Sequence, residues 1–157
     1  MAAPSITIVN DADVTVASWD SGTVQANTDS AILKIHIWNN RGGSSALSDL
    51  KDASITTLDI DGGSSSDVVA GKWVQVNCAC VDGSETVWQA VGGTTVKFIR
   101  ADSLNASDGY VIRGTTNDGT FSNSKANYST CRLKVHVPLN ATPGTKTWKT
   151  RLNGYYV

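Results

Sequence analysis

The chain has 157 residues, with 13 basic and 14 acidic side chains and a formal net charge of −1. This length matches one ordinary domain whose core is large enough to fold without disulfides or metals. The chain has no basic run, no apolar run of transmembrane length and, in Met1–Ser5, no signal-peptide pattern, so we expect neither nucleic acid nor a membrane as a partner.

Period-two alternation of apolar and polar residues dominates the chain and predicts β-strands. The strongest predicted strand is Ala31–Trp38, in which Leu33, Ile35 and Ile37 face a core while His36 and Trp38 point to the opposite face. The other predicted strands, in chain order, are Ser5–Val9, Val14–Trp19, Ser54–Ile60, Trp73–Cys78, Thr86–Ala90, Thr95–Arg100, Tyr110–Arg113, Tyr128–Val137 and Thr145–Leu152. The only predicted helical turn is Ser45–Ala53.

One five-residue pattern occurs twice. Leu33–Ile37 (LKIHI) recurs as Leu133–Val137 (LKVHV). The matched alternation predicts that Ala31–Trp38 and Thr130–Val137 are antiparallel neighbours, with His36 and His136 on one outer face. Pairing between strands so distant in sequence is typical of a Greek-key β-sandwich. We therefore predict an all-β, immunoglobulin-like Greek-key sandwich that spans residues 1–157 as a single domain.

The segment Pro138–Gly144 (PLNATPG) follows a long strand and precedes the last one. Pro138 ends ladder pairing, and Pro143-Gly144 suits a turn across a sandwich edge. This corner resembles that of immunoglobulin-like domains of the CARDB type, which implies a sandwich in which the two long strands are neighbours. Residues 44–107 match no such pattern, so we expect that they include an insertion with its own contacts.

The stretch from Asn117 to Leu152 resembles small structural proteins of tailed bacteriophages, which serve as head decoration, collar or baseplate components. The resemblance lies in small size, in richness in Ser, Thr, Asn and Gly, and in the sandwich pattern. It implies a protein made in the host cytoplasm and carried on the virion.

The three cysteines are Cys78, Cys80 and Cys131. An odd count argues against a disulfide framework. Alternation places Cys78 and Cys80 on one strand face, where a C-x-C pair could bind a metal. Because no second pair or nearby histidine completes a ligand set, we interpret the cysteines as buried structural thiols.

Two further groups invite a metal-site interpretation. His36 and His136 would share a face, but no third ligand is evident, so we interpret them as solvated or interface residues. Asp59–Gly63 resembles the start of a calcium loop, yet Ala70 stands where the closing glutamate would be. We interpret that segment as a turn and expect no metal or other cofactor.

Aromatic residues supply the interface candidates. Five tryptophans could fill a sandwich core or stack on sugars. Trp38 points outward by alternation, and the chain ends in the aromatic pair Tyr155 and Tyr156. We expect Trp38, Tyr155 and Tyr156, together with the outward His36 and His136, to contact a partner protein.

No nucleophile elbow, phosphate loop or carboxylate pair indicates an enzyme. The sequence therefore favours a non-enzymatic virion protein, with head decoration ranked narrowly above a tail or baseplate role. Its expected partners are capsid or tail proteins, which it would bind in several symmetric copies. The alternative is a carbohydrate-binding or adhesion module, which would need a row of exposed aromatic side chains.

Overall fold

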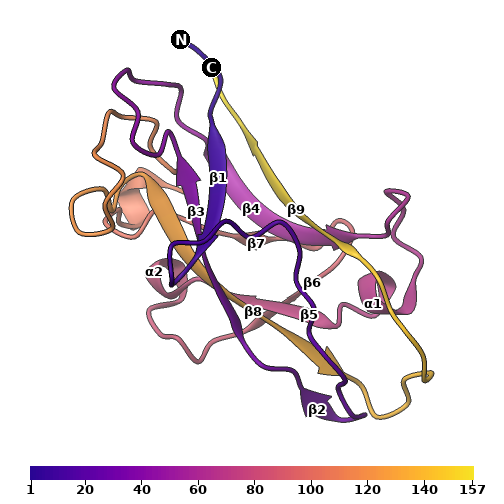
Figure 1. Ribbon diagram of the computed structural model, residues 1–157. Helices are drawn as coiled ribbons and strands as arrows, with labels where there is room; N and C mark the ends of the chain where they lie inside the picture. The colour runs from indigo at the N-terminus through magenta and orange to yellow at the C-terminus, as the bar shows by residue number, and fades with distance from the viewer.

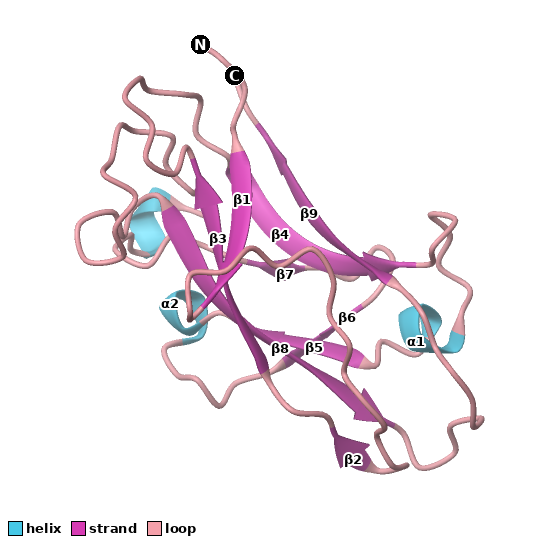
Figure 2. Ribbon diagram, viewed as in Figure 1, coloured by secondary structure: helices cyan, strands magenta, loops and turns pink.

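The computed structural model describes all 157 residues; its regular secondary structure is almost entirely β-strand, joined by long loops (Figures 1 and 2). The elements are β1 (Ile6–Asn10), β2 (Thr28–Asp29), β3 (Leu33–Asn39), β4 (Lys51–Leu58), α1 (Asp67–Ala70), β5 (Val74–Asn77), α2 (Ala79–Asp82), β6 (Gln89–Val91), β7 (Lys97–Phe98), a 3-10 turn (Ala106–Asp108), β8 (Tyr128–Val137) and β9 (Lys149–Tyr155). None of the helices is long and apolar enough to cross a membrane.

The strands form two antiparallel sheets, which confirms the prediction of an all-β sandwich. The larger sheet has the order β1-β3-β8-β5-β6, with β2 added beside β8, and the smaller sheet has the order β7-β4-β9. Residues 44–107 supply β4 and β7 to the smaller sheet and β5 and β6 to the larger one.

The predicted pairing of the two long strands is confirmed. β3 and β8 are antiparallel neighbours, with Leu33 opposite Leu133 and Trp38 opposite Tyr128. Ile35 and Leu133 are 5% and 1% exposed and belong to the core between the sheets. Burial of each such side chain contributes about 1.5–3 kcal/mol, so the alternating pattern fixes which face of the pair is internal.

The predicted helical turn at Ser45–Ala53 is wrong. The segment is irregular up to Asp49, and β4 begins at Lys51. Leu50 forms an isolated bridge with Ile112 and is buried in the core. Spacing by three placed Leu47 and Leu50 on one helical face, but long-range pairing overrides such a weak local preference.

The placement of Cys78 and Cys80 on one strand face is also wrong. β5 ends at Asn77, and Cys78 precedes the helical turn α2. The Cys78 amide donates to Asp82 Oδ2 (2.9 Å), and the turn ends at Gly83 in the left-handed region (φ 71°). This side-chain cap offers the backbone an alternative to continued pairing, so the strand stops there.

Candidate functional site

Two of the predicted interface residues, His36 and Trp38, lie on the outer face of the larger sheet but are buried. Trp38 has no exposed surface and packs against Tyr128 and Phe121, with ring centroids 4.6 Å and 5.5 Å away. Alternation gave the correct face, but the loop that carries Phe121 covers it. The expectation of Trp38 as an exposed anchor is therefore wrong, and this ring belongs to a second, smaller core.

His36 is 7% exposed and holds two segments together. Its Nε2 lies 2.8 Å from Asp11 Oδ1, and its Nδ1 lies 2.9 Å from the Thr130 hydroxyl, which donates to Asp102 Oδ2 (2.6 Å). Burial raises the pKa of Asp11, but hydrogen bonds from His36 and Lys34 outweigh it, so the pKa lies below its ordinary value. His36 is thus a structural contact, and its expected role at an exposed interface is wrong.

His136 lies on the same sheet face but far from His36. The register places His36 opposite Thr130, six positions before His136, or about 20 Å along β8. The His136 side chain is 41% exposed, and its Nδ1 lies 2.7 Å from Asp29 Oδ1. Hydrogen bonds from Lys134 and His136 lower the pKa of Asp29. The two histidines therefore do not form one site.

The edge strand β9 is a candidate binding feature. It pairs with β4 on one side only, and outside the sheet ladders no backbone hydrogen bond reaches it. Thr57 of β4 accepts from the Gly93 amide (2.9 Å), so its backbone groups point away from β9. Thr150 is the partner of Thr57, and backbone groups alternate along a strand, so the Thr150 amide points to the unpaired edge.

The C-terminal residues extend this edge. Tyr155 and Tyr156 are 50% and 53% exposed. The chain end is held in place because the Ser48 hydroxyl donates to the Val157 carbonyl (3.1 Å) and the Ser48 amide donates to the Ala2 carbonyl (2.9 Å). Both termini thus lie side by side (Figure 1).

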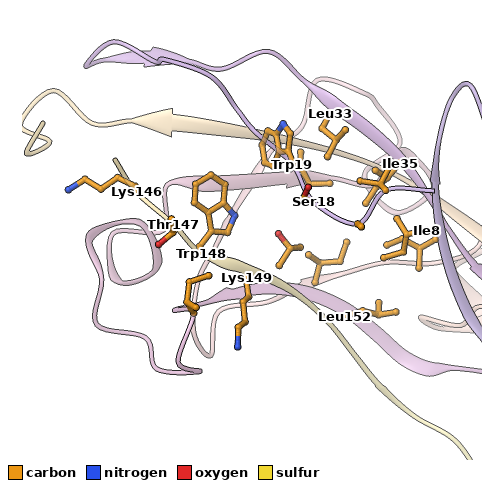
Figure 3. A pocket seen from close by; sticks show the side chains of 17 residues that line it. Ile8, Ser18, Trp19, Leu33, Ile35, Lys146, Thr147, Trp148, Lys149 and Leu152 are labelled. Carbon is orange, nitrogen blue, oxygen red and sulfur yellow. The ribbon is translucent and has the colours of Figure 1, made fainter. Parts of the chain in front are cut away.

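A cavity of about 520 Å³ lies between the sheets beside β9. Figure 3 shows its apolar lining, with Ile8 from β1, Ile35 from β3 and Leu152 from β9. β1 and β9 each lie at an edge of their sheet and do not pair with each other. The cavity therefore lies at the open side of the sandwich, between these two edges.

Two partly exposed tryptophans stand at the outer end of this cavity (Figure 3). Trp19 lies in the irregular segment between β1 and β2 (residues 11–27), called the strap from here on. Trp148 immediately precedes β9. Their ring centroids are 5.9 Å apart and the planes are nearly perpendicular, at 88°. An edge-to-face pair presents no flat stacking surface of two rings. No sequence pattern separates these two tryptophans from core residues, because the strap and the last strand meet only in the fold.

The edge also carries unpaired positive charge. Lys149 and Arg151 are exposed on β9 and form no ion pair within the chain. Charged side chains on an edge strand prevent indiscriminate strand addition. The site therefore combines an open backbone ladder, an apolar cavity and two cations, which together suit an extended, acidic peptide segment.

Comparison with known proteins identified no matching family model, no matching curated protein and no matching solved structure.

Proposed function

We propose that this protein is a non-catalytic structural protein of a tailed-phage virion, made in the host cytoplasm, that binds capsid or tail proteins in several symmetric copies. Head decoration is the role ranked first. The assignment to a virion rests on the resemblance of the C-terminal region to phage structural proteins. The mode of binding rests on one observation, the unpaired β9 edge beside an apolar cavity.

In this mode a neighbouring virion protein adds an extended segment to β9. Main-chain hydrogen bonds to Thr150 and its alternate neighbours supply affinity, and inward side chains of the segment enter the cavity mouth. Acidic side chains on the segment pair with Lys149 and Arg151. Tyr155 and Tyr156 lie at the rim, where aromatic side chains contribute strongly to binding.

Cosedimentation with assembled particles tests this proposal. Thr150→Pro removes the outward amide and should reduce binding at least tenfold, because proline is tolerated on an edge but blocks strand addition. Thr150→Val retains the amide and should bind as wild type. Tyr156→Ala should weaken binding and leave the fold intact. Equal binding by the proline and valine variants would exclude strand addition, and tight binding to a defined glycan without affinity for particles would favour the adhesion alternative.

A further inference from the structure

Cys78 and Cys131 face each other across the centre of the larger sheet. β5 and β8 are antiparallel, with Asn77 opposite Arg132. Cys78 retains an extended backbone (φ −131°, ψ 98°), so the register continues and places it opposite Cys131. Both thiols are free and buried in the same core cluster.

The pair occupies the closer of the two kinds of antiparallel position. The His136 amide donates to the Trp73 carbonyl (2.8 Å), so these two residues form a hydrogen-bonded pair. The two kinds of pair alternate along the strands, and Cys78 and Cys131 lie five positions from Trp73 and His136, so they form a non-hydrogen-bonded pair. In agreement, the Cys78 amide donates to Asp82 Oδ2 (2.9 Å) and not to β8. Such pairs have Cα atoms about 4.5 Å apart, within the range that a disulfide spans.

The surroundings of the two thiols favour reaction at Cys78. The Ser129 hydroxyl lies 3.5 Å from Cys78 Sγ and 3.6 Å from Cys131 Sγ. A hydrogen bond from Cys131 outweighs the effect of burial and, with Ser129, lowers the pKa of Cys78 to about 6. The same contact and burial raise the pKa of Cys131. Of the two thiols, Cys78 therefore forms the nucleophilic thiolate more readily.

We propose that Cys78 and Cys131 are an oxidation site at which hydrogen peroxide converts the dithiol into a cross-strand disulfide. The Cys78 thiolate attacks one peroxide oxygen, the O–O bond breaks, and the departing oxygen takes a proton and leaves as water. Cys131 then attacks the sulfenic sulfur and loses its proton, and the hydroxyl leaves as a second water. Two thiols are oxidised, one peroxide is reduced, and the bond links β5 to β8.

Both thiols are fully buried in the core. A hollow of about 500 Å³ is lined by Ala79 and Cys80, directly after Cys78. The Cys80 sulfur is directed elsewhere, within 3.2 Å of the Ala101 and Leu104 carbonyls, so the third cysteine stays outside the link. Because Cys78 has no exposed surface, the proposed reaction requires a local opening where β5 ends. This site lies at the end of β5 and on β8 and is separate from the β9 edge proposed as the binding surface.

Peptide mapping of the full chain after hydrogen peroxide treatment tests the proposal. Trypsin leaves Cys78 and Cys80 on one peptide, residues 73–97, and Cys131 on another, residues 126–132. Treated wild-type protein should yield these two peptides joined, lose two hydrogen atoms in mass, and gain several degrees in Tm that a reducing agent reverses. Cys80→Ser should still form the link, which assigns it to Cys78.

Three outcomes would overturn the proposal. They are a link between Cys78 and Cys80, loss of the joined peptides in Cys80→Ser, and accumulation of sulfinic acid on Cys78 without any link. The rate gives a second measurement that needs no core substitution. Oxidation should slow about tenfold at about pH 5 relative to about pH 7.5, because the thiolate of Cys78 is protonated below about pH 6.

Discussion

The two copies of the repeated pentapeptide have nearly the same sequence and very different surroundings. In β3, His36 is 7% exposed and bridges Asp11 and Thr130. In β8, the side chain of His136 is 41% exposed and pairs with Asp29 at the surface. The inward residues of both copies share one core. The inward side chains of the two copies are therefore buried alike, whereas the outward histidines differ in burial.

The cause of the difference lies far from both copies. The loop around Phe121 and the turn that holds Asp11 cover the outer face of β3. Asp118 fixes that loop, because it accepts hydrogen bonds from Thr120, Asn123 and Ser124. His136, near the end of β8, has no such cover. A strand pattern thus predicts which face a side chain is on, whereas coverage of that face depends on other segments.

Trp38→Ala should produce the largest effect, because it removes the ring at the centre of the covered outer face. We expect a loss of about 3–5 kcal/mol in the free energy of unfolding, measured by urea denaturation. The Trp38 indole N–H has no hydrogen-bond partner, so Trp38→Phe, which keeps most of the packing, should cost much less. A change below about 0.5 kcal/mol for Trp38→Ala would mean that this face is open.

Ile35→Ala and Leu133→Ala compare the inward faces of the two copies. Both side chains lie in the core between the sheets, so each substitution should cost about 2–5 kcal/mol by the same denaturation assay. Near-equal losses would show that the copies are equivalent inside. A loss confined to one variant would mean that only one of the copies is packed against the smaller sheet.

His36→Ala and His136→Ala address the outward faces directly. His36→Ala leaves a buried hydroxyl without one of its contacts and releases Asp11, so we expect a loss of about 1–3 kcal/mol. His136→Ala removes only a surface pair and should cost less than about 1 kcal/mol. The difference in unfolding free energy between the two variants measures how much the loop around Phe121 and the turn at Asp11 contribute to stability at His36. Equal values would remove the distinction between the copies.

Acid should reveal the smallest difference. Hydrogen bonds from Lys134 and His136 lower the pKa of Asp29 below its ordinary value of 3.8 in the folded state. Its stabilisation is therefore complete above that value and is lost as the pH falls further. Asp29→Asn should flatten the loss of stability below about pH 4 by less than about 1 kcal/mol, because the pair is exposed. Thermal unfolding across this range provides the measurement, and an unchanged slope would contradict it.

The sequence by itself determined the class of fold and the faces of the main strands. Alternation of apolar and polar residues is a local property that follows from strand geometry, so β8 and the pairing of β3 with β8 were predictable. The helical turn at Ser45–Ala53 failed because a short segment carries too little local preference to resist long-range pairing.

Only the tertiary structure decided which outward residues are accessible and which distant residues meet. Burial of Trp38 depends on a loop more than eighty residues away, and the cavity beside β9 depends on a strap and a closing strand from opposite ends of the chain. The opposition of Cys78 and Cys131 likewise depends on register between β5 and β8. Periodicity specifies direction along one strand, but contact between strands is a property of the whole fold.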